Sequence, residues 1–103
     1  MERGTTPTHI FNIPSDIASA VKEVKVVYSQ NDSIILEKRT DACTIEGSRI
    51  IIKLSQEETF LFDCTKLAYI QVRVLTHSGE CLKSKVMIES VGKCLDICKV
   101  KER

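Results

Sequence analysis

The chain has 103 residues, which is enough for one hydrophobic core and too short for two domains of ordinary size. Two Tyr, three Phe and no Trp leave the core mainly to Ile, Val and Leu, a composition that favours strands. Fifteen Lys and Arg against fourteen Asp and Glu give a net charge of +1, with the signs interspersed along the sequence. This charge gives no reason to expect nucleic acid or an anionic membrane as a partner.

No stretch approaches the roughly eighteen uninterrupted apolar residues of a membrane-spanning helix, and the first residues lack the apolar segment of a signal peptide. We therefore expect a protein that is cytoplasmic when made. In a reducing compartment the five cysteines are expected to be thiols, and an odd number cannot all pair within one chain.

Short strands separated by turn residues are the main pattern along the chain. Pro14 ends the first predicted strand, and residues 15–20 fit either a helical turn or a loop. Residues 24–29 show the period of two that is typical of a half-buried strand. Asn and Asp within residues 30–33 tolerate positive φ, so this strand should double back on the next one as a hairpin. The predicted strands span residues 8–13, 24–29, 34–39, 49–54, 69–75 and 82–91.

The stretch KLSQEETFLFDC, residues 53–64, interrupts this series of strands. Ser55 followed three residues later by Glu58 fits a capping box, which predicts a short helical turn. Phe60 and Phe62 follow it and are available to cover the open end of a core. We interpret this turn as a crossover from one sheet to the other and not as a site.

These elements predict an all-β protein, an antiparallel immunoglobulin-like β-sandwich of about six or seven short strands with one short helical crossover turn. A smaller open barrel is the alternative. The sandwich is expected to span residues 1–92, followed by a C-terminal tail at 93–103. The residues expected to face the core are Val24, Val26, Tyr28, Ile34, Leu36, Ile50, Ile52, Leu54, Ile70, Val72, Val74, Val86 and Ile88.

Candidates for chemistry are few. Neither His9 nor His77 can be given a nucleophile and an orienting carboxylate, so no catalytic residue and no cofactor is predicted. Cys94 and Cys98 are four residues apart and would share one face of a helix, which makes them the candidates for a metal site. The remaining cysteines are far apart in sequence and fit buried apolar positions. No phosphate-binding Gly-rich loop is present, and no small-molecule substrate is expected.

The segments RGTTPTHIFNIP, VKVVYSQNDSIILEK, CTIEGSRIIIKLSQEETFLFD and YIQVRVLTHSGECLKSKVMIESVGKCLD cover nearly the whole chain. In this arrangement the sequence resembles small proteins encoded in prophages of Gram-positive gut bacteria. The element KLSQEET after a Gly-containing turn also resembles the N-terminal sandwich of phage baseplate upper proteins. The resemblance implies a phage context, a β-sandwich and a structural role in the tail or virion, with which the protein would then be associated.

Two functions of different class follow. The first is a non-enzymatic structural or protein-interaction module of phage tail, baseplate or virion assembly, and the second is a small thiol or metal-binding regulatory module that uses Cys94 and Cys98. Strand alternation gives the first function a candidate surface, because Val27, Ile35 and Ile51 fall on the face opposite to the predicted core. Two interpretations are open: these three form one apolar patch for self-association or for docking a protein partner, or the strand at 49–54 joins the other sheet and scatters them. The C-terminal tail, with Leu95 and Ile97, is the alternative cover for such a patch.

Overall fold

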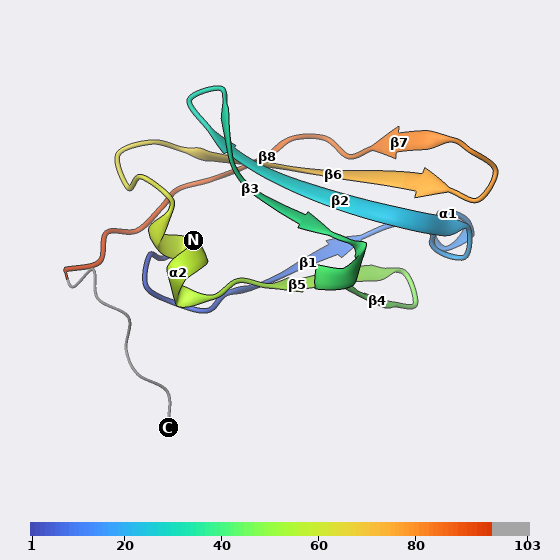
Figure 1. The fold of residues 1–103 in the computed structure, drawn as a ribbon, viewed down its shortest axis with the longest axis horizontal. Coiled ribbons are helices and arrows are strands. Elements are labelled where there is room, and N and C mark those ends of the chain that lie inside the picture. Colours follow the sequence, from blue (N-terminus) through green and yellow to red (C-terminus); the bar gives the residue numbers. More distant parts are fainter. Residues whose placement is uncertain (96–103) are drawn as a thin grey trace.

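The computed structural model describes residues 1–95, in which two antiparallel sheets pack face to face (Figure 1). The three-stranded sheet has the order β1 (Thr8–Asn12), β5 (Arg49–Lys53), β4 (Thr44–Glu46). The five-stranded sheet has the order β3 (Ser33–Arg39), β2 (Val21–Gln30), β6 (Ala68–Thr76), after which both β7 (Cys81–Lys83) and β8 (Met87–Glu89) pair with β6. The predicted all-β sandwich is confirmed.

Three short helical segments connect these strands. They are α1 (Ser15–Ala18), the 3-10 turn η1 (Thr40–Ala42) and α2 (Gln56–Phe60). Within residues 1–95 no helix has the length and apolar character needed to cross a membrane. The described part of the chain has eight strands, more than the six or seven expected, because β4 forms between the predicted strands 34–39 and 49–54 and the last predicted strand is divided into β7 and β8.

The central pair of strands, β2 and β6, supplies most of the five-stranded sheet's share of the core. Val24 lies opposite Val74, and Val26 lies opposite Val72, so branched side chains face one another across the two strands. All four are buried, because every second residue of each strand points towards the three-stranded sheet. Nine of the residues predicted to face the core are buried, namely Val24, Val26, Tyr28, Ile50, Ile52, Leu54, Ile70, Val72 and Val74, and Leu36 is partly buried against them.

The hairpin between β2 and β3 forms as predicted, but one residue on β3 was assigned to the wrong face. Asn31 and Asp32 have φ values of 49° and 63°, the conformation that a tight two-residue turn requires. A bulge beside the turn then shifts the register, so that Ile34 pairs with Ser29 on the outer face. Ile34 is therefore 61% exposed instead of buried, and the extra residue, Ile35, packs against the core.

The last predicted strand, 82–91, is interrupted by Ser84. Its hydroxyl accepts a hydrogen bond from the Val72 N–H at 3.0 Å, and its own N–H donates to the Val72 carbonyl at 2.8 Å. The Ser84 hydroxyl thus takes the place of a backbone carbonyl as the partner of the Val72 N–H. Beyond Ser84, the residues that pointed inward by the period of two point outward instead. Val86 and Ile88, predicted to face the core, are 51% and 60% exposed as a result.

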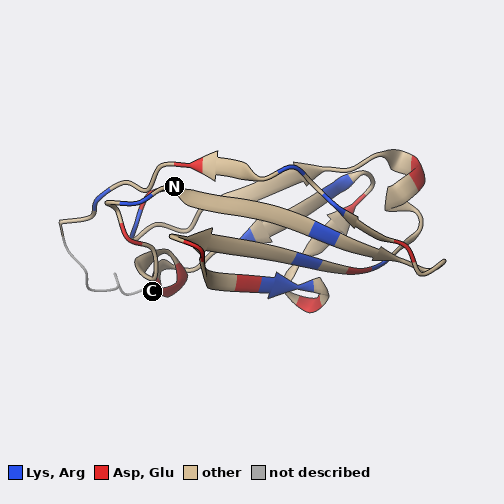
Figure 2. Cartoon of the chain, turned by 90° about the horizontal axis from the view of Figure 1, so that it is seen from above, with Lys and Arg blue, Asp and Glu red and all other residues tan. Residues whose placement is uncertain are grey.

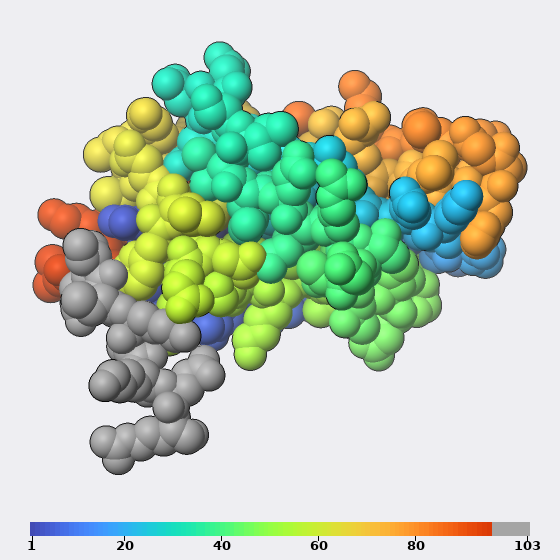
Figure 3. All heavy atoms as spheres, in the orientation of Figure 1, coloured from blue at the N-terminus to red at the C-terminus, as the bar shows by residue number. Residues whose placement is uncertain are grey.

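Helix α2 begins with the predicted capping box and carries the chain from β5 in one sheet to β6 in the other. The Ser55 hydroxyl accepts from the Glu58 N–H at 3.1 Å, and the Glu58 carboxylate accepts from the Ser55 N–H at 2.8 Å. Glu58 also forms an ion pair with Lys38 of β3, which ties the helix to the five-stranded sheet. Figure 3 shows the yellow-green atoms of this crossover lying against the teal and green atoms of β3. The crossover interpretation is confirmed.

Replacing Ser55 by Ala should lower the free energy of unfolding by about 1 kcal/mol, because the cap on the Glu58 N–H is lost. Chemical denaturation measures this difference. Ser15→Ala is the matched control, since Ser15 is exposed in the first turn of α1, a helix that has no side-chain cap. Equal effects of the two substitutions would show that the capping box contributes nothing specific.

Candidate functional site

The outer face of the five-stranded sheet carries a line of basic residues that runs across four neighbouring strands. Lys25 of β2 lies opposite Arg39 of β3 on one side and Arg73 of β6 on the other, and Arg73 lies opposite Lys83 of β7. We call Arg39, Lys25, Arg73 and Lys83 the basic row. Side chains directly opposite one another in an antiparallel sheet have Cβ atoms about 5 Å apart, so these four charges are close neighbours. Figure 2 shows blue segments next to one another on adjacent strands of this sheet.

One half of the basic row is neutralised within the chain and the other half is not. The Glu37 carboxylate lies 3.3 Å from Lys25 Nζ and 3.6 Å from the Arg39 guanidinium. No carboxylate of the described residues forms an ion pair with Arg73 or Lys83. The attraction for an anion is therefore strongest on the β6 and β7 side of the row.

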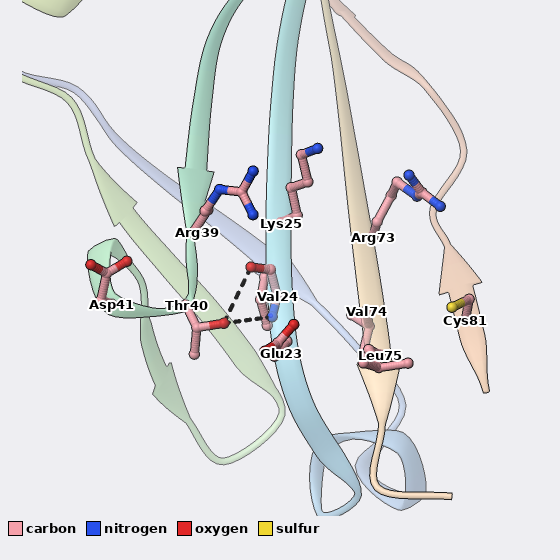
Figure 4. A pocket seen from close by; sticks show the side chains of 10 residues that line it. All are labelled: Glu23, Val24, Lys25, Arg39, Thr40, Asp41, Arg73, Val74, Leu75 and Cys81. Carbon is pink, nitrogen blue, oxygen red and sulfur yellow. Dashed lines mark hydrogen bonds between the residues drawn. The ribbon is translucent and has the colours of Figure 1, made fainter. Parts of the chain in front are cut away.

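Thr40, the first residue of η1, holds the end of β3 beside β2 and thereby places Arg39 next to Lys25. Its hydroxyl accepts from the Val24 N–H at 2.9 Å and donates to the Val24 carbonyl at 3.3 Å. Figure 4 shows these two bonds, with Arg39, Lys25 and Arg73 beside one another on three strands. A hollow of about 390 Å³ lies here, and Glu23, Asp41 and Cys81 also line it. The arrangement can hold an anionic group between arginine and lysine side chains.

The same face carries exposed apolar residues nearer to the β2–β3 turn. Tyr69 of β6 lies opposite Ile88 of β8 and opposite Ser29 of β2, which in turn lies opposite Ile34 of β3. We call Ile34, Tyr69 and Ile88 the apolar row; their exposed fractions are 61%, 37% and 60%. A smaller hollow of about 260 Å³ lies beside it, lined in part by Tyr69 and Val86.

The three residues predicted to form one apolar patch do not lie together. Val27 is on the outer face of the five-stranded sheet, where it lines the smaller hollow beside Tyr69. Ile51 is in β5 of the other sheet, opposite Ile10. Ile35 packs against the core, because the bulge in β3 turns it inward. The predicted face was therefore wrong for Ile35, and a contiguous patch of these three residues is excluded.

The two cysteines proposed for a metal site are not both described. Cys94 packs beside Gly4, which has φ of +78°, and near the Phe60 ring, whereas Cys98 lies outside residues 1–95. Within the described range, no three or more His, Cys, Asp or Glu side chains are grouped so that they could hold a metal ion. Cys43 and Cys64 are partly buried against the core, as expected for small apolar residues. The prediction was wrong for Cys81, which is exposed because it lies opposite Leu75 at the start of β7.

His9 belongs to a polar cluster that joins the two sheets. Its Nδ1 atom is 2.7 Å from the Tyr28 hydroxyl on β2, and its Nε2 atom is 3.7 Å from the Glu89 carboxylate on β8. The Met1 ammonium group is 3.6 Å from the same carboxylate. Burial lowers the pKa of His9, although the Glu89 charge acts in the opposite direction, and burial raises the pKa of Tyr28. The cluster is therefore a structural link between the two sheets, made of an imidazole, a phenol, a carboxylate and the N-terminal ammonium group.

The other polar candidates have structural roles. His77 is exposed in the loop after β6, where its backbone N–H donates to the Ala20 carbonyl at 2.9 Å. Burial by itself would raise the pKa of Glu58, but its bonds with Lys38 and with the Ser55 N–H lower it, as expected for a capping carboxylate.

Sequence reasoning missed the basic row because its members are fourteen, thirty-four and ten residues apart along the chain, from Lys25 to Arg39, from Arg39 to Arg73 and from Arg73 to Lys83. Only three cross-strand registers, taken together, bring them side by side. The only feature of the sequence that pointed to the basic row was a basic residue at an outward position in each of several predicted strands. No family model matches the chain, and neither curated proteins nor solved structures gave a significant match.

Stability should fall as the pH is lowered from about 7.5 to 5.5, because the lowered pKa of His9 makes the unfolded chain bind the proton before the folded chain does. The loss begins near the ordinary value of 6.5 and continues until folded His9 is itself protonated. Denaturation at several pH values measures the slope, which His9→Gln should reduce. His77→Gln, at an exposed loop position, should leave it unchanged, and a slope that survives in His9→Gln would contradict the assignment.

Arg73→Gln should raise the free energy of unfolding at low salt by a few tenths to about 1 kcal/mol, because it removes a positive charge opposite Lys25 and Lys83. The gain should vanish in about 1 M salt, where exposed charges are screened. Chemical denaturation at both salt concentrations measures it. Arg49→Gln on the outer face of β5 is the control and should give no comparable gain.

Proposed function

We propose that this protein is a non-enzymatic interaction module that binds an acidic surface of a partner protein through the basic row. The observation that carries the proposal is the alignment of Arg39, Lys25, Arg73 and Lys83 in a chain whose net charge is only +1. Like charges opposite one another reduce the stability of a sheet, so the row has a cost that an anionic partner would remove.

A protein surface fits the row better than a nucleic acid does. Glu37 lies between two of the cations, and Glu23 and Asp41 line the same hollow. A phosphate backbone has a regular line of negative charges, which would meet these carboxylates as well as the cations. A protein partner can place carboxylates beside Arg73 and Lys83 and uncharged groups beside Glu37.

The setting that we propose is the assembly of a phage tail, baseplate or virion. What supports this setting is the resemblance of the quoted segments to prophage proteins, together with an all-β fold suited to a structural role. The alternative of a thiol or metal-binding module on Cys94 and Cys98 stays a prediction, since Cys98 lies outside the described residues.

A fluorescein-labelled oligoglutamate peptide is a direct probe of the basic row, with binding measured by fluorescence anisotropy at low salt. We expect the double variant Arg73→Glu with Lys83→Glu to bind roughly tenfold more weakly than the wild type, because both cations without an internal carboxylate are reversed.

The matched control is Arg49→Glu with Lys53→Glu, which makes the same change in net charge on the outer face of the three-stranded sheet. It should weaken binding far less. Equal losses in the two double variants would mean that the peptide responds to net charge alone, and the proposal would fail.

A further inference from the structure

The basic row and the apolar row lie on one continuous face. Lys25 and Ser29 mark the two rows on β2, four residues apart, which is about 13 Å along a strand. Val27 and its cross-strand neighbours Glu37 and Gln71 occupy the space between them. A single partner segment that runs along the strands would therefore contact both rows.

The exposed apolar side chains of the apolar row are consistent with a surface that a partner covers. Ile34 and Ile88 are each about three-fifths exposed, and Val86, which lines the same hollow as Tyr69, is half exposed. Apolar residues that gather on one face and have polar residues at their rim are typical of an interaction site. Here the rim on one side is the basic row, which specifies the charge of whatever covers the apolar row.

The geometry of a sheet face favours a helix as the covering segment. The backbone groups of β2 and β6 are used within the sheet, so its face offers side chains and no backbone partners. An extended segment laid on the apolar row would lose water from its own N–H and C=O groups without replacement, whereas a helix satisfies these groups internally. At 1.5 Å per residue, about nine helical residues span the 13 Å between the rows.

We infer that the partner offers an amphipathic helix that lies along the strands, with apolar side chains over Ile34, Tyr69 and Ile88 and carboxylates over Arg73 and Lys83. This inference rests on the proposed function and adds the form of the partner segment. At 3.6 residues per turn, positions nine apart face opposite sides, so the helix carries its acidic residues seven to eight positions, or eleven, from its apolar ones, the same-side spacings closest to this span.

Two labelled synthetic helical peptides of about 18 residues and identical composition test the inference by anisotropy. One has its Leu and Glu residues in two separate clusters at this spacing, and the other has them interleaved. The clustered peptide should bind about tenfold more tightly. Its affinity should fall several-fold on Ile34→Ser with Ile88→Ser and on Arg73→Glu, but not on Ile10→Ser, which replaces an exposed apolar residue on the other sheet.

The other outcomes would overturn the inference in distinguishable ways. If the two peptides bind equally well and only Arg73→Glu lowers their affinity, the proposed function is supported but the inference of a helical partner segment is wrong. Insensitivity of both peptides to Arg73→Glu would remove the proposed function itself. Tighter binding of an oligothymidine strand that depends on Tyr69 would make the partner a nucleic acid. A wild-type dimer in sedimentation that Ile34→Ser dissociates would make it a second copy of this chain.

Discussion

The pairing of β2 with β6 is the constraint on which the rest of the molecule depends. Its register places Val26 opposite Val72 in the core and, one residue away, Lys25 opposite Arg73 on the outer face. Because strand side chains alternate, neither arrangement can change without the other: a slip of one residue would expose the valines and bury the cations. Burial of the valines thus fixes the register of β2 with β6, and this register in turn places Lys25 beside Arg73 in the basic row.

The parts of the fold that follow from local sequence were predictable. The turn at Asn31 and Asp32 needs positive φ, the cap at Ser55 needs a hydroxyl three residues before a carboxylate, and the inward positions of β2, β5 and β6 follow a period of two. Each of these features depends on residues within one short segment. The link between the sheets through α2 followed as well, because a single helical turn stood between two strong strand patterns.

The errors arose where a strand does not keep its period. The bulge opposite Tyr28 adds one residue to β3, and Ser84 replaces a backbone partner of Val72 with its hydroxyl, so the pattern changes phase at both places. The sequence shows the residues involved but not the strand that they lie beside, and both events depend on that neighbour. For the same reason the basic row could not be predicted from the sequence. Its four residues become neighbours only through the registers of three strand pairs, and separation along the chain does not give those registers.

A nearly neutral chain can still present a selective surface, because selectivity depends on where charges lie and not on their sum. Glu37 neutralises the β3 end of the basic row and leaves the β6 and β7 end without an internal partner. An anion is therefore drawn to Arg73 and Lys83, while an anion placed near Arg39 meets a carboxylate as well. A uniformly negative partner would gain at one end and lose at the other. A partner of the proposed kind, with its carboxylates confined to the Arg73 and Lys83 end, would gain throughout, so the uneven neutralisation of the row would select the arrangement of charge on that partner as well as its sign.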